Sequence, residues 1–98
     1  MDLLKGEIQK NGFLYKLYKK GEKAYMYEQS DPREDAFHAY EVFKIRIDKP
    51  KEIFGIQLPE REKFPGNEDF GKWAWSCNQL DRALIKFELI ETGKIDEE

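Results

Sequence analysis

The sequence predicts an α+β fold, in which an antiparallel β-meander of three to four strands packs against one C-terminal α-helix. Two observations predict it. Between residues 13 and 47, runs of β-prone residues alternate with short polar or glycine-containing turns, which is typical of antiparallel hairpins. Near the C-terminus, apolar residues recur at helical spacing, and a sheet with one apolar face needs such a helix as a cover.

Turn-forming residues delimit the strands. Asn11-Gly12 is a hairpin signal, Lys20-Gly21-Glu22 interrupts a β-prone run, and residues 30–35 form a polar loop that contains proline. Three strands are expected at residues 13–18, 24–27 and 37–47, and residues 4–9 supply a fourth if Asn11-Gly12 is itself a hairpin turn. We expect the last of these, the longest, to pair with residues 24–27.

Alternation along the long strand divides its side chains between two faces. Ala39, Phe43, Ile45 and Ile47 are expected to face the helix. The opposite face would be left open, because a single helix cannot cover both sides of a sheet. The open face is the predicted partner-binding surface, and its candidate residues are Tyr40, Val42, Lys44, Arg46, Tyr25 and Tyr27.

The helix is expected at about residues 78–91. Leu80, Ala83, Leu84 and Phe87 fall on one face of such a helix. Asn78 is one candidate N-cap, and a capping box formed by Ser76 and Gln79 is the other; Gly93 suits the position just after the helix. We expect Leu84, Phe87, Phe43 and Ile45 to be buried together between the helix and the sheet.

The segment from residue 49 to residue 66 is the least regular, and we expect a loop over residues 50–75 to fill one end of the sheet. Ile53-Phe54-Gly55-Ile56 could add a short edge strand flanked by prolines, and Asn67 could cap a short helical turn. Trp73 and Trp75 would share one face if extended and would diverge if helical. Both indoles are assigned to the core in preference to a stacking surface, although the pattern permits either.

Length and composition favour one domain, residues 1–98, with fraying expected at residues 1–10 and 92–98. The formal charge of −3 gives no general signal for nucleic-acid binding, although four lysines cluster between residues 16 and 23. One cysteine, no signal-peptide pattern and no long apolar run lead us to expect a cytoplasmic protein that does not enter a membrane.

Residues that could carry catalysis are few. His38 and Cys77 could form a catalytic dyad only if the fold brings them together, and a structural role for both is favoured. The acidic cluster Glu60, Glu62, Glu68 and Asp69 lacks the spacing of a calcium loop, so capping and solvated roles are favoured there. No phosphate-binding glycine loop occurs in the sequence, and we expect no cofactor.

Part of the sequence resembles short proteins of bacterial phages and mobile genetic elements. The resemblance is carried by Asn11-Gly12-Phe13 with Tyr15, Ala24-x-x-Tyr27-x-Gln29, Tyr40-Glu41-Val42-Phe43-Lys44-Ile45 and the run from Pro59 to Trp75. It implies a phage or mobile-element setting and assigns no catalytic residue.

These observations favour a small non-enzymatic module that binds a protein partner, or a second copy of itself, through the open sheet face. An accessory or inhibitor role is implied by the resemblance alone. Nucleic-acid binding by the sheet is the alternative, supported by the lysine cluster and by Lys44 and Arg46. A small enzyme is the third alternative, and the least favoured.

Overall fold

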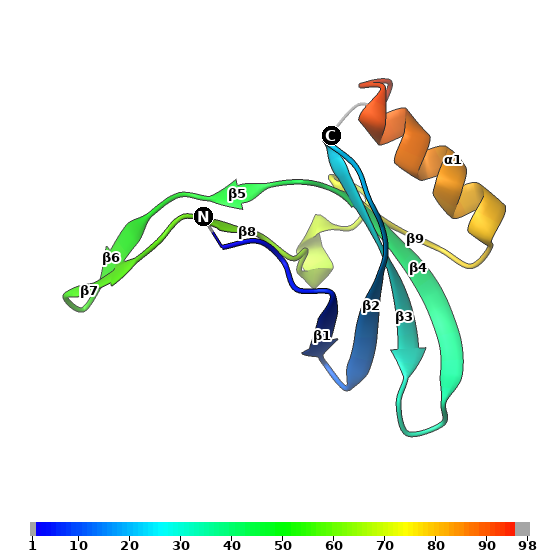
Figure 1. Cartoon of the computed structure of the whole chain (residues 1–98), viewed down its shortest axis with the longest axis horizontal. Helices are drawn as coiled ribbons and strands as arrows, with labels where there is room; N and C mark the ends of the chain where they lie inside the picture. The colour runs from blue at the N-terminus through cyan, green and yellow to red at the C-terminus, as the bar shows by residue number, and fades with distance from the viewer. Residues whose placement is uncertain (1, 96–98) are drawn as a thin grey trace.

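The computed structural model describes residues 2–95 and contains one five-stranded antiparallel sheet with a single α-helix packed against it (Figure 1). The strands of this sheet, in their spatial order, are β1 (Glu7–Lys10), β2 (Phe13–Lys20), β3 (Ala24–Asp31), β4 (Ala36–Lys44) and β9 (Ala74–Cys77). The helix α1 spans Leu80–Glu91 and contacts β3, β4 and β9. The predicted fold class is therefore confirmed.

The predicted turns connect the first four strands. Asn11 and Gly12 both have positive φ angles, 55° and 83°, which is the backbone of a type I′ hairpin between β1 and β2. The chain ends expected to fray lie partly outside the described residues, and within them Glu7–Lys10 form β1.

The fifth strand, β9, corrects the prediction for residues 67–75. We expected a helical turn and a loop there. The turn exists as a short 3-10 helix, η1 (Asn67–Asp69), but Gly66 and not Asn67 is its N-cap. The chain then extends beside β4, pairing Ala74 with Phe43 and Trp75 with Val42. Local propensity gave no sign of this strand, because it pairs with residues more than thirty positions earlier.

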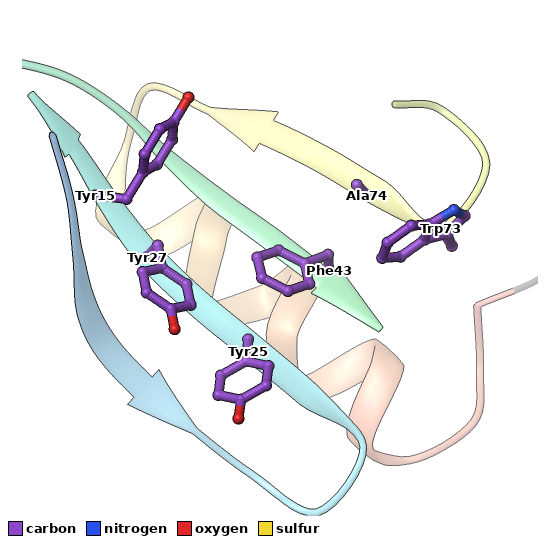
Figure 2. Packing of buried hydrophobic residues seen from close by; sticks show 6 residues of the cluster. All are labelled: Tyr15, Tyr25, Tyr27, Phe43, Trp73 and Ala74. Atoms are coloured by element: carbon purple, nitrogen blue, oxygen red, sulfur yellow. The ribbon is translucent and has the colours of Figure 1, made fainter. Parts of the chain in front are cut away.

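Strand β3 is buried on both faces. Ala24, Tyr25, Met26 and Tyr27 are each at most 1% exposed, and alternate residues point to opposite sides of the sheet. One side contributes to the helix-face cluster, which comprises Ala24, Met26, Val42, Ala83, Phe87 and Ile90. The other contributes to the aromatic-face cluster, which comprises Tyr15, Tyr25, Tyr27, Phe43, Trp73 and Ala74. Figure 2 shows these aromatic rings on the side of the sheet away from the helix.

Irregular chain covers the aromatic face. Leu4 packs on it from the N-terminal segment before β1, and Phe64 and Phe70 pack on it from the segment that leads to β9. The ring of Phe64 meets Tyr15, Tyr27 and Phe43 edge to face, with centroids 4.9, 5.7 and 5.3 Å apart. Edge-to-face contacts add to the stabilisation from burial alone. The sheet therefore has two covers.

The faces are assigned the opposite way from the prediction. Alternation along β4 is as expected, but Val42 meets the helix, and Phe43 lies on the aromatic face. The Phe87 side chain of the helix is 3% exposed and packs against the sheet, as predicted. Leu84, on the same helix, is only half-buried. Ile45 is half-buried against the aromatic face and not against the helix. Small residues such as Ala24 and Ala83 let the helix approach the sheet closely, and the bulky rings on the other side fill the space beneath irregular chain.

The C-terminal end of the helix is as the sequence predicts, and the N-terminal end is not. Its N-cap is Gln79, which makes no side-chain capping bond, so neither Asn78 nor the predicted capping box is used. At the C-terminus Gly93 has a φ of 71°, and the amides of Gly93 and Lys94 donate to the carbonyls of Ile90 and Leu89. These two bonds form a Schellman motif with the predicted glycine at C′. No helix among the described residues is long and apolar enough to cross a bilayer.

Trp73 and Trp75 pack on the core as predicted, but they do not share one face and lie on opposite sides of the sheet. Trp73 precedes β9, where the Gly71 amide donates to the Ala74 carbonyl and closes a tight turn. Trp75 packs against the helix-face cluster, with the Lys86 ammonium 5.2 Å from the centroid of its ring.

The aromatic face buries one carboxylate without full pairing. Glu41 pairs across the strands with Tyr27 and Ser76 and is 6% exposed. Burial raises its pKa, and a hydrogen bond with the Ser76 side chain offsets only part of the effect. Its Oε2 atom accepts no hydrogen bond from any residue between 2 and 95.

Replacing Phe87 tests the helix cover. Phe87→Ala should lower the free energy of unfolding by about 3–5 kcal/mol, because it removes a buried ring and leaves a cavity. Ile85→Ala, on the same helix but at a position 61% exposed, is the matched control and should shift the thermal midpoint far less. Equal shifts for the two variants would contradict the packing described here.

The buried carboxylate makes stability depend on pH. Because the pKa of Glu41 is raised in the folded state, the ionised form is disfavoured there, and stability falls as pH rises through the unfolded pKa of about 4.3 towards the folded value. Glu41→Gln removes this loss. The thermal midpoint of the variant should lie above that of wild type at neutral pH, and the difference between the two midpoints should become smaller at lower pH. A difference between the two midpoints that does not change with pH would contradict the raised pKa of Glu41.

Candidate functional site

The predicted partner-binding face is not an open surface. Val42 is fully buried beneath the helix, and Tyr25 and Tyr27 are fully buried on the other side of the sheet. Their hydroxyl groups are bonded within the chain: Tyr25 donates to Glu62 Oε1, and Tyr27 donates to the Lys5 carbonyl. These three residues cannot contact a partner in this fold, and that part of the prediction is wrong.

The other predicted contact residues are scattered. Tyr40 is half-buried on the helix side, with its ring against Tyr18 and Phe37 at 5.7 and 4.9 Å between centroids. Lys44 is half-buried, and the Arg46 guanidinium lies 5.5 Å from the centroid of the Trp73 ring on the aromatic side. The six residues therefore do not form one surface, and nucleic-acid binding through an open sheet face loses its structural basis.

The candidate catalytic residues are not assembled either. The exposed His38 ring lies against Phe13, 4.9 Å between centroids, whereas Cys77 packs with the helix-face cluster on the other side of the sheet. Of the acidic cluster, Glu62 accepts the Leu4 amide and Asp69 accepts the Gly66 amide. Among the described residues, no group of three or more His, Cys, Asp or Glu side chains is placed to hold a metal ion.

The most exposed apolar surface lies on an arm that projects from the sheet, formed by residues 47–62 (Figure 1). Two short antiparallel ladders build it: β5 (Ile47–Asp48) with β8 (Arg61–Glu62) at the base, and β6 (Lys51–Ile53) with β7 (Ile56–Leu58) at the tip. Pro50 and Pro59 lie between the ladders, where they cannot donate backbone hydrogen bonds. We had expected this segment to fill one end of the sheet, which is wrong.

The arm extends the molecule. The radius of gyration is 14.2 Å, against about 13 Å for a compact domain of 100 residues. Strands β6 and β7 pair with each other, and neither packs extensively on another described strand or helix. The tip therefore gains little stability from the body of the domain.

The base of the arm is tied to the body by hydrogen bonds. The Asp2 amide donates to the Glu60 carbonyl, and the Glu62 amide donates back to the Asp2 carbonyl, at 3.1 and 2.8 Å. The Lys63 amide donates to the Arg46 carbonyl at 2.8 Å and joins the two segments at the base of the arm. The Glu62 side chain receives the Leu4 amide and the Tyr25 hydroxyl. These bonds fix the base of the arm to the body of the domain.

The tip is apolar. Phe54 is 99% exposed, and its neighbours Ile53 and Ile56 are 42% and 63% exposed. Ile47, on the same arm, is 45% exposed. Adjacent exposed side chains of this size mark interaction sites, whereas single exposed apolar residues are ordinary on protein surfaces.

Phe54 also occupies an unfavourable backbone conformation. The φ angles of Phe54 and Gly55 are 51° and 77°, so the tip is a type I′ turn like the one at Asn11-Gly12. Asn suits the first position of such a turn, and a bulky side chain there costs about 1–2 kcal/mol. The chain therefore uses the favourable residue in one hairpin and an unfavourable, fully exposed ring in the other.

A sequence signal for this site existed. Ile53-Phe54-Gly55-Ile56 has the form of two β-branched residues around a two-residue loop that ends in glycine, which is a hairpin pattern. The prediction treats these four residues as one short edge strand flanked by prolines, and the structure shows a hairpin instead. The exposure of the ring depends on the projection of the arm, which the local sequence does not encode.

Phe54→Asn tests whether the ring serves the fold. Asn tolerates the left-handed backbone, and almost no buried surface is lost, so the variant should stabilise the hairpin by roughly 1 kcal/mol. Amide hydrogen exchange in β6 and β7 should become slower, and the global thermal midpoint should not fall. Faster exchange in these strands would show that the ring has a structural role.

Comparison with known proteins adds no relative to this description. No family model matches the chain, and neither a curated protein nor a solved structure matches it significantly. The phage or mobile-element setting implied by the sequence resemblance stays a prediction.

Proposed function

We propose that the protein is a non-enzymatic binding module that engages a partner protein with the tip of its arm. The observation that carries the proposal is Phe54, which is 99% exposed and held in a left-handed conformation. A residue that costs stability and buries nothing in its own chain is best explained by a contact with another molecule. The expected binding site is a hydrophobic groove or pocket on the partner.

The arm has the features of an interface anchor. Aromatic side chains at the centre of an interface supply most of its binding energy, and flanking apolar residues exclude water around them. Phe54 would occupy the centre, with Ile53 and Ile56 beside it. The hydrogen-bonded base reduces the conformational freedom that binding would otherwise have to restrict.

The charge of the arm favours protein over nucleic acid. Lys49, Lys51 and Arg61 oppose Asp48, Glu52, Glu60 and Glu62, which gives three positive against four negative charges and a formal charge of −1 on the arm. Apolar side chains can wedge between base pairs, but such proteins also neutralise phosphates with basic residues. The arm lacks the excess of positive charge that this requires.

The test compares three forms of the chain: wild type, Phe54→Asn and Ile85→Gln. The last removes another exposed apolar side chain, 61% exposed, from the helix and serves as the control. Partners captured by wild type and by Ile85→Gln should be lost with Phe54→Asn. With a purified partner, the affinity should fall by about 2 kcal/mol or more, roughly thirtyfold.

If the partner is a second copy of the chain, the purified protein alone is enough for the test. In that case, sedimentation of wild type alone should show a dimer that Phe54→Asn lacks and Ile85→Gln keeps. Equal binding by all three forms would contradict the proposal. So would binding that survives Phe54→Asn and is abolished by moderate salt and nuclease treatment, because that pattern indicates nucleic acid.

A further inference from the structure

Strand β9 forms one edge of the five-stranded sheet, and a groove of about 770 Å³ lies beside it. Figure 2 shows β9, in yellow, beyond β4 at this edge of the sheet. Trp75, Ser76 and Cys77 of β9 line the groove, together with Arg82 and Lys86 of the helix α1. Binding sites commonly have volumes of about 300–1,000 Å³, so the groove has the size of such a site.

The outer edge of β9 carries backbone groups that point away from the sheet. The Lys44 amide donates to the Trp73 carbonyl at 2.9 Å, and bonded and non-bonded pairs alternate along two antiparallel strands. Trp75, opposite Val42, is therefore bonded to β4, whereas the amide and the carbonyl of Ser76 point outward. Among the described residues, no strand pairs with this edge.

The open part of the edge is centred on Ser76. The carbonyl of Ala74, which also points outward, accepts the Gly71 amide at 2.8 Å and is used by the chain itself. Ser76 is exposed, and its side chain forms a hydrogen bond with Glu41 on the aromatic side of the sheet. An extended segment can therefore pair with the backbone of Ser76 without displacing a bond within the chain. Extended peptides that add a strand to a sheet edge bind in this way.

Two basic side chains give the groove a positive charge. Arg82 and Lys86 are four residues apart on the helix, so they lie on the same face of it. Neither forms an ion pair with a residue between 2 and 95. Burial raises the pKa of the Cys77 thiol, and the charges of Lys86 and Arg82 offset part of that rise, so both lie near β9. None of the described residues that line the groove is acidic, so the groove favours a carboxylate.

We propose that the groove binds an extended acidic segment of a partner protein, which pairs with the backbone of Ser76 as an added strand and places carboxylates against Arg82 and Lys86. Side chains alternate along a strand, so acidic residues two positions apart would both face the helix. The residue between them would lie on the side of Phe70, which also lines the groove. None of these residues belongs to the arm, so this proposal and the proposed function can fail separately.

Other occupants use less of the groove. A free phosphate or carboxylate would meet the two cations but would leave the outward backbone groups of Ser76 without a strand to pair with. A neutral peptide would pair with the edge but would gain nothing from Arg82 and Lys86. A nucleic acid would find only two basic side chains here, and affinity for its backbone depends on neutralising several phosphates.

The test is a titration of the full chain with blocked peptides, followed by backbone amide chemical shifts. The probe is acetyl-Thr-Glu-Val-Glu-Thr-amide, whose two acids occupy alternate positions in either strand direction. Saturable shifts are expected at Trp75, Ser76 and Arg82. The same peptide with glutamine in place of both acids should bind about tenfold more weakly, because it loses two ion pairs. A peptide N-methylated at its three central residues keeps both charges and should not bind, because it cannot donate to the edge.

The matching change in the protein is the double variant Arg82→Gln/Lys86→Gln. It should weaken binding of the acidic peptide by about tenfold and leave binding of the glutamine peptide unchanged, because only the acidic peptide interacts with the two charges. Lys94→Gln, which removes an exposed charge beyond the other end of the helix, is the control and should bind the acidic peptide as wild type does. Thermal melts of the variants check that the fold is kept.

Four results would overturn the proposal. The first is no saturable shift with the acidic peptide, and the second is equal binding of the acidic and glutamine peptides by wild type. The third is equal binding of the N-methylated peptide, which would show that the backbone of Ser76 takes no part. The fourth is binding of inorganic phosphate at the same residues as tightly as the acidic peptide, which would show an anion site that needs no added strand.

Discussion

The burial of β3 on both faces is the constraint on which the rest of the structure depends. Residues 24–27 are almost completely inaccessible, so apolar side chains on both sides of the sheet must be covered. The described residues contain only one α-helix, and it covers one side. The other side is covered by extended and irregular chain, which can follow the uneven surface of the rings. A small domain buries a modest share of its surface, and here even its loops are used for this purpose.

The second cover explains the position of the arm. After β4 the chain must return to the sheet as β9, and the segment from Phe64 to Trp73 reaches it across the aromatic face. Between the two, residues 47–62 leave the body and come back as paired strands. Their base is fixed by the same N-terminal segment that covers the aromatic face. The arm is therefore free to carry an exposed tip, because β6 and β7 take no part in covering the sheet.

Two buried carboxylates on the aromatic side show how differently the same residue type is used. Glu62 accepts the Tyr25 hydroxyl and the Leu4 amide, and it joins the base of the arm to the sheet. Burial and its hydrogen bond to Glu62 raise the pKa of Tyr25, so this hydroxyl stays a donor throughout the ordinary pH range. Glu41 has an oxygen without a donor and lies in a pocket. The carboxylate oxygens of Glu62 are used by the fold only in part, whereas at Glu41 burial raises the pKa, a Ser76 hydrogen bond offsets part of that effect, and Oε2 has no donor among the described residues.

The sequence by itself determined the α+β class, the first four strands, the turns at Asn11-Gly12 and Lys20-Gly21-Glu22, and the helix with Gly93 after it. These features depend on alternation, helical spacing and glycine, which act over a few residues. Only the tertiary structure decided that Val42 and not Phe43 meets the helix, that residues 74–77 form a fifth strand, and that Tyr25 and Tyr27 are buried. It also decided that Phe54 projects into solvent and that Glu41 lacks a donor. Alternation assigns side chains to two faces, but which cover each face receives depends on contacts between residues far apart in the chain.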